Sequence, residues 1–136
     1  MLTARTVVLY ACHCLECQKQ SASAFALSAP GRLADLAVHG SPVAYEQPAD
    51  GGSRTTCWFC PECGTRIYHQ SSRATDRVTL KAGRLDNTRG LVQVAHLWVG
   101  RKQSWLKLSA DVPAYETRPD DLAGWRDALI APAESR

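Results

Sequence analysis

Short apolar or alternating runs dominate the hydrophobic pattern of this chain, and glycine and proline separate them. Runs of this length that are rich in β-branched residues are typical of strands rather than helices. The strands that they predict are 6–11, 24–29, 54–59, 65–69, 77–81, 92–99 and 105–108, together with a hairpin of 36–39 and 43–46. Many short strands punctuated in this way favour an all-β, mainly antiparallel fold.

Two segments break the strand pattern, and each predicts a short helix near one end of the chain. Residues 14–21 follow the first strand and predict a short helical segment. Residues 119–131 predict a C-terminal helix, because Leu122, Trp125 and Leu129 fall on one face at helical spacing. A helix near each end therefore completes the expected β fold.

Composition and charge narrow the class of protein. The chain has 136 residues, 45% of them hydrophobic, so it can bury an ordinary core, and we expect one domain over residues 1–136. The net charge is +3, and the sixteen basic residues are interspersed with thirteen acidic ones. The basic residues therefore do not form the stripe that is typical of nucleic-acid-binding proteins. No apolar run approaches membrane-spanning length. Thiols without an export signal predict a cytoplasmic protein.

The cysteines supply the candidate chemistry. All six lie in two clusters, which are Cys12, Cys14 and Cys17 in the first and Cys57, Cys60 and Cys63 in the second. Each cluster contains a Cys-x-x-Cys step, which lets two sulfurs converge on one ion from a tight turn, and Gly64 can take the positive φ that such a turn needs. An even cysteine count also fits disulfides, but a core of this size needs no covalent staples. The spacing therefore favours zinc.

Two zinc arrangements remain open from the spacing. In the first, Cys12, Cys14 and Cys17 form a tripod and leave a fourth position open, which suits a catalytic zinc that binds a thiol substrate as its thiolate. In the second, Cys14 and Cys17 join Cys60 and Cys63 in one closed structural site, as in zinc ribbons. The first arrangement predicts an enzyme, and the second predicts a non-catalytic module for protein contact.

Several motifs together resemble one known family. They are Cys12-x-Cys14-x-x-Cys17-Gln18-Lys19-Gln20-Ser21, Phe59-Cys60-Pro61-Glu62-Cys63-Gly64-Thr65-Arg66, Lys81-Ala82-Gly83-Arg84-Leu85-Asp86, Ala95-His96-Leu97-Trp98, Trp105 and Val112-Pro113-Ala114-Tyr115. In this order the sequence resembles the glutathione-dependent formaldehyde-activating enzyme family, whose domain is shared with centromere protein V.

The resemblance implies several coiled antiparallel β-sheets and two zinc sites. It implies a catalytic zinc on Cys12, Cys14 and Cys17, and a structural zinc to which Cys60 and Cys63 contribute half of the ligands. The other half comes, in the family, from a Cys-x-Cys on a first strand, which has no counterpart in the eleven residues before Cys12. A missing first strand would leave a sheet edge exposed and make a homo-oligomer plausible.

The family reaction implied by the resemblance is that of a carbon–sulfur lyase. Its substrate would be an adduct of a glutathione-like thiol and an aldehyde, such as S-(hydroxymethyl)glutathione, with zinc as the cofactor. His96 is expected to be a core histidine with catalysis as the alternative, and His13 a solvated loop histidine with a role as base as the alternative.

Charged and aromatic residues near the motifs add further expectations. Cations at 19, 66, 81 and 84 are candidates to neutralise an anionic zinc centre or to bind the carboxylates of glutathione, although each is individually expected to be solvated. The four tryptophans are expected to lie in the core. They are Trp58, Trp98, Trp105 and Trp125.

Overall fold

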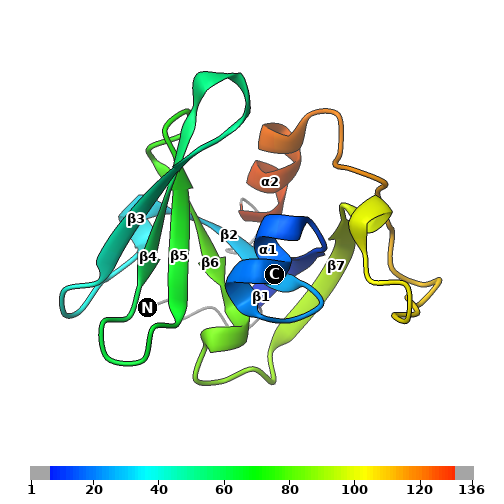
Figure 1. Ribbon diagram of the computed structural model, residues 1–136, viewed down its shortest axis with the longest axis horizontal. Helices are drawn as coiled ribbons and strands as arrows, with labels where there is room; N and C mark the ends of the chain where they lie inside the picture. Colours follow the sequence, from blue (N-terminus) through cyan, green and yellow to red (C-terminus); the bar gives the residue numbers. More distant parts are fainter. Residues whose placement is uncertain (1–6, 131–136) are drawn as a thin grey trace.

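One seven-stranded sheet forms the scaffold of the protein (Figure 1). A computed structural model describes residues 7–130, with strands in the spatial order β3-β4-β5-β6-β2-β1-β7. Their bounds are β1 Val7–Cys12, β2 Ala26–Arg32, β3 Val43–Pro48, β4 Arg54–Phe59, β5 Arg66–Ser71, β6 Arg77–Lys81 and β7 Leu91–Leu97. Neighbouring strands are antiparallel, except that β1 and β7 are parallel. The expected mostly β, mainly antiparallel fold is confirmed, and its strands join in one mixed sheet.

Two α-helices lie on the same side of this sheet (Figure 1). Helix α1 spans Leu15–Ser21 and packs against β2, and helix α2 spans Leu122–Ile130 and packs against β2 and β1. Both fall within the ranges that the sequence predicts, and residue 131 lies outside the described part of the chain. Within residues 7–130, short 3-10 turns lie between strands at Leu33–Asp35, Asp50–Gly52 and Ala82–Arg84, and a further one follows β7 at Val99–Arg101. No helix within residues 7–130 is long and apolar enough to cross a membrane.

The two faces of the sheet bury separate apolar clusters, because side chains alternate along a strand. Adjacent residues of β1 illustrate this: Leu9 enters one cluster and Tyr10 the other. The first cluster consists of Leu9, Ala29, Tyr68, Val78, Leu80 and Ala82. The second consists of Tyr10, Cys12, Cys17, Ala26, Ala95 and Leu97, with Leu122, Trp125 and Leu129 of α2 packed against it. Two of the three clustered N-terminal cysteines are therefore part of the core under α2.

Strand β2 differs from its prediction because it continues through Pro30 and Gly31, where we expected a turn. Pairing with β1 ends at Ser28, whereas pairing with β6 runs on through Pro30 opposite Thr79. Proline lacks an N–H, so it is tolerated where one side of a strand has no partner. The sequence pattern does not show on which side the neighbouring strand stops.

The predicted hairpin of 36–39 with 43–46 is wrong in its first half. Leu36 follows the turn at Leu33–Asp35 and packs against the first apolar cluster, and no strand forms there. The partner of β3 is instead β4, along six consecutive pairs from Val43 opposite Phe59 to Pro48 opposite Arg54. A long antiparallel pairing closed by a short loop satisfies more backbone groups than a two-strand fragment around Gly40 would.

The predicted strand 105–108 is also absent. Leu106 closes a turn by donating its N–H to the carbonyl of Gln103, and Trp105 is 67% exposed, so its assignment to the core is wrong. The edge of β7 is occupied by residues further along the chain: Ala114 forms a bridge with His96, whose N–H donates to the Pro113 carbonyl. The loop before Pro113 is thereby left on the surface.

Candidate metal centre

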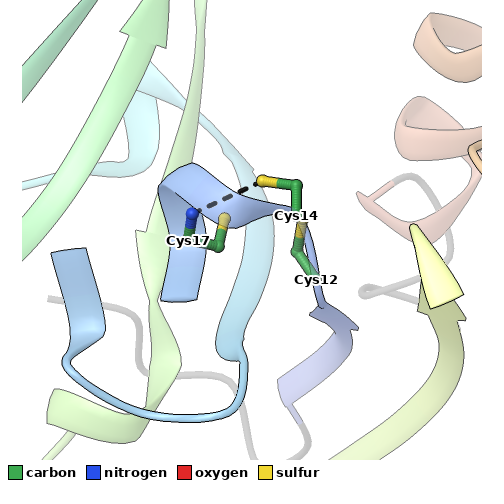
Figure 2. A group of neighbouring side chains, drawn as sticks. All are labelled: Cys12, Cys14 and Cys17. Carbon is green, nitrogen blue, oxygen red and sulfur yellow. Dashed lines mark hydrogen bonds between the residues drawn. The ribbon is translucent and has the colours of Figure 1, made fainter. Parts of the chain in front are cut away.

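Three sulfur atoms converge where β1 passes into α1. The Sγ atoms of Cys12, Cys14 and Cys17 all lie within 4.8 Å of one another. Cys12 is the last residue of β1, Cys14 is the N-cap of α1, and Cys17 lies in its first turn (Figure 2). The cap itself holds this geometry, because the Cys14 sulfur accepts a hydrogen bond from the Cys17 backbone N–H at 3.4 Å. We call these three residues the thiol tripod.

The tripod fits a zinc ion. With Zn–S bonds of about 2.3 Å, a tetrahedral site places its sulfurs about 3.8 Å apart, which is compatible with three sulfurs that all lie within 4.8 Å of one another. Soft thiolates are also the ligands that zinc prefers over the hard ligands of magnesium or calcium. Within residues 7–130, no fourth cysteine, histidine or carboxylate joins this group.

The three thiols share protons in the absence of an ion. Hydrogen bonds from Cys12 and then Cys17 hold the pKa of Cys14 well below its usual range. Hydrogen bonding to Cys14 and Cys17, followed by burial, raises the pKa of Cys12. For Cys17 the hydrogen bond with Cys12 lowers the pKa, but the bond with Cys14 and burial together outweigh it and raise the pKa. Cys14, which is also the least buried of the three, is therefore the first thiolate.

Lys81 places a cation in the core next to the tripod. It is 8% exposed, and its Nζ donates a hydrogen bond to Ser28 Oγ at 3.0 Å. Burial lowers the pKa of Lys81 to about 8, while the nearby sulfurs of Cys17 and Cys12 act in the opposite direction. Of the candidate cations at 19, 66, 81 and 84, Lys81 is therefore the one whose charge interacts with the tripod sulfurs.

Two histidines pack behind the loop between Cys12 and Cys14. His13 is fully buried, so the expectation of a solvated loop histidine is wrong; its Nε2 lies 3.0 Å from Nδ1 of the buried His96. Burial, then the charges of His96 and Lys102, lowers the pKa of His13 to about 4. Burial also lowers the pKa of His96, so the pair is neutral at pH 7. Gln93 contacts His96 at 3.0 Å, and no sequence pattern indicated this residue.

The second cysteine cluster forms a knuckle that is separate from the tripod. The Cys60 N–H donates to the Thr65 carbonyl, the Gly64 N–H donates to the Cys60 carbonyl, and Gly64 has the expected positive φ of 75°. Cys63 is exposed, and hydrogen bonding to Thr65 is the main factor that lowers its pKa to about 7. Cys57 does not join the knuckle: it is fully buried, with its sulfur 4.0 Å from the Gln20 side chain.

The closed site of Cys14, Cys17, Cys60 and Cys63 is therefore not formed. Within the described residues the only group of three or more suitable ligand atoms is the thiol tripod. Cys60 and Cys63 remain a pair, and their assignment as metal ligands stays a prediction.

Fold and site together define a mostly β protein with a cluster of three thiols that could hold a metal ion. The sequence pattern of the family described as "Glutathione-dependent formaldehyde-activating enzyme" matches residues 1–101, and the chain belongs to this family. A crystal structure of a Rhodobacter sphaeroides protein is similar, with 26% sequence identity, a TM-score of 0.47 and an overlap of 62% of this chain and 78% of that one. No curated protein matches the chain significantly.

Proposed function

We propose that the protein is a zinc-dependent carbon–sulfur lyase that acts on an adduct of a glutathione-like thiol and an aldehyde, such as S-(hydroxymethyl)glutathione. The observation that carries this proposal is the convergence of three sulfurs within 4.8 Å, with no fourth protein ligand among residues 7–130. Structural zinc sites use four protein ligands, whereas catalytic sites use three. Family membership supports the same reaction class.

A zinc ion held by Cys12, Cys14 and Cys17 would supply an open coordination position and stabilise the substrate sulfur as a thiolate. The reaction S-(hydroxymethyl)glutathione → glutathione + formaldehyde breaks the C–S bond, and the bonding electron pair goes to sulfur. The hydroxyl group loses its proton as the C=O bond forms, and the departing sulfur finally takes up one proton, so the reaction needs no oxidant or reductant.

Charge balance is the first contribution of the chain itself. Three thiolates around a dication carry a net negative charge, which is costly to bury without a cation nearby. Lys81 is buried, has one hydrogen bond to a neutral hydroxyl, and feels the charges of Cys12 and Cys17. Its ammonium group therefore balances the charge of the loaded site.

The buried histidine pair makes the second contribution. The 3.0 Å contact between His13 Nε2 and His96 Nδ1 needs one N–H donor and one lone pair, and it fixes the loop that carries Cys12 and Cys14 against β7. The backbone supports the same position, since the His13 N–H donates to the Leu97 carbonyl at 2.9 Å. His96 is our candidate for the group that accepts the hydroxyl proton.

A direct assay tests this function. Zinc-loaded protein is expected to release formaldehyde from S-(hydroxymethyl)glutathione faster than the spontaneous reaction, and Cys14→Ser is expected to lose both this activity and the tripod zinc. Cys57→Ser is the matched control, because it makes the same exchange at a thiol that belongs neither to the tripod nor to the Cys60 and Cys63 pair. Retention of full activity by Cys14→Ser would contradict the proposal.

Cobalt substitution separates the lyase from a non-catalytic zinc module. Cobalt(II) in an open tripod is expected to change its visible spectrum when glutathione adds a fourth sulfur, since the spectrum reports the ligand set. A spectrum that glutathione leaves unchanged would indicate a closed structural site, and the lyase assignment would then fail.

A further inference from the structure

A groove runs along the outer side of α1. It has a volume of about 570 Å³, opens to solvent, and is lined by Gln18, Lys19 and Ala22 at the helix and by Gln103 and Trp105 on the opposite wall. This volume falls within the range of sites that bind small organic ligands. Gln103 and Trp105 follow residues 1–101, so this wall lies outside the part of the chain that the family pattern matches.

The groove is lined in part by the helix face that begins at Cys14. Cys14, Gln18 and Ala22 are spaced i, i+4 and i+8, so they follow one face of the helix, and Cys14 is the least buried tripod cysteine. At 1.5 Å per residue, Ala22 lies roughly 12 Å along the helix axis from Cys14. An extended tripeptide spans about 10 Å and glutathione carries its sulfur on the central residue, so one arm of roughly 5–7 Å reaches from the tripod to the near end of the groove at Gln18, roughly 6 Å along the helix axis from Cys14.

A chain of hydrogen bonds fixes the groove wall to the metal loop. Trp105 Nε1 donates to Gln103 Oε1 at 2.7 Å, and Gln103 Nε2 donates to Gln18 Oε1 at 3.2 Å. Gln18 Nε2 in turn donates to the carbonyl of His13 at 2.7 Å and to that of Arg101 at 2.9 Å. The indole is therefore held in place despite its exposure, and it is tied to the loop between Cys12 and Cys14.

The lining of the groove matches an anionic peptide. Trp105 is 67% exposed and lines the groove, so it offers a flat apolar surface on which a peptide can pack. Lys19 is exposed and enters no ion pair within the described residues, so its ammonium is available for a carboxylate. Gln18 and Gln103 line the same groove and are hydrogen-bonded to each other.

We propose that this groove binds the peptide part of a small anionic peptide thiol of glutathione size, with Lys19 holding a carboxylate and Trp105 packing against the peptide. The identity of the occupant rests on the proposed function, which places the sulfur of the same ligand at the tripod. Lys19 and Trp105 then decide which thiol adducts the protein accepts.

Binding of S-methylglutathione tests the groove independently of catalysis. This probe keeps both carboxylates but has no free thiol, so it needs no chemistry at the metal. Calorimetry with the zinc-loaded protein is expected to detect binding, and Lys19→Met and Trp105→Ala are each expected to weaken it by about tenfold, the loss of one charged or aromatic contact. Lys107→Met is the matched control, because this exposed lysine lies in the same surface loop as Trp105 but outside the groove lining.

Kinetics supply a second readout. Lys19→Met and Trp105→Ala are expected to raise KM for S-(hydroxymethyl)glutathione by about tenfold with kcat changed less than about twofold, as expected for lost binding away from the reacting bond. The hydroxymethyl adduct of 2-mercaptoethanol has no peptide part, and both variants should process it like the unmodified protein.

The outcomes separate the two proposals. If S-methylglutathione binds, both variants bind it more weakly, and the protein has no lyase activity, then the groove assignment is supported and the proposed function fails. If the protein is an active lyase but both variants bind S-methylglutathione as tightly as the Lys107→Met control, or if no binding occurs at millimolar concentrations, the groove assignment is overturned.

Discussion

Replacing Lys81 by methionine should stabilise the metal-free protein. Methionine keeps the length of the buried side chain but removes the charge. Burial lowers the pKa of Lys81 from 10.5 to about 8, and each pKa unit corresponds to about 1.4 kcal/mol, so the ammonium destabilises the metal-free fold by about 3 kcal/mol at pH 7. Loss of the hydrogen bond to Ser28 opposes this by about 1 kcal/mol. We expect a net gain of about 2 kcal/mol.

The pH dependence carries the same signature. The folded state releases the Lys81 proton near pH 8, whereas the unfolded chain keeps it up to about pH 10.5. Between these values the unfolded state binds more protons, so the stability of the metal-free protein rises with pH from this source, and the penalty is fully present below pH 8. Lys81→Met removes this rise, so the difference between the two curves reports Lys81 together with the titrations of Cys12 and Cys17 that its charge influences.

Zinc binding should respond with the opposite sign. The loaded tripod is anionic, and the Lys81 ammonium is the buried cation beside it, so the methionine variant is expected to bind zinc at least about tenfold more weakly. Urea unfolding of the metal-free protein under reducing conditions gives the first quantity, and competition with a chelator gives the second. Lys107→Met should change neither. A variant that is less stable without metal and binds zinc as tightly as the unmodified protein would refute the charge-balance reasoning.

Three further predictions concern the core, a buried histidine and the knuckle. Trp125→Ala removes the edge-on packing against Tyr10, with ring centroids 5.3 Å apart, and should lower stability by about 2–3 kcal/mol in urea titrations; a loss below about 0.5 kcal/mol would contradict the packing of α2. Metal-free stability should fall as the pH drops from 6.5 towards 4, since His13 stays neutral in the fold while the unfolded chain takes up a proton, and His13→Phe should flatten this slope. Cys63 should be alkylated before Cys57 in the metal-free protein at pH 7, as read by peptide mass spectrometry; earlier labelling of Cys57 would be inconsistent with its burial.

Local pattern accounts for most of the secondary structure. The runs that became β4 and β6 have the predicted bounds, and α1 at Leu15–Ser21 lies within the helical segment predicted for 14–21. The misses at Pro30 and at residues 36–39 share one cause. Whether a proline or a short apolar run is accepted in a strand depends on which neighbour the sheet supplies, and that neighbour is distant in sequence.

The tripod was predictable because its members lie within six residues, so one strand end and one helix cap determine its geometry. The residues that surround the tripod could not be predicted from the sequence. Lys81 reaches the tripod from β6, and His96 meets His13 from 83 residues away, through the pairing of β1 with β2 and β7.

The sequence by itself therefore determined the three clustered thiols, most of the strands and the family, since these depend on neighbouring residues. Only the tertiary structure decided which cation lies beside the thiols, that His13 is buried, and that Trp105 lines a groove instead of the core. Those properties depend on strand order and burial, which are set by contacts between residues that are distant in the sequence.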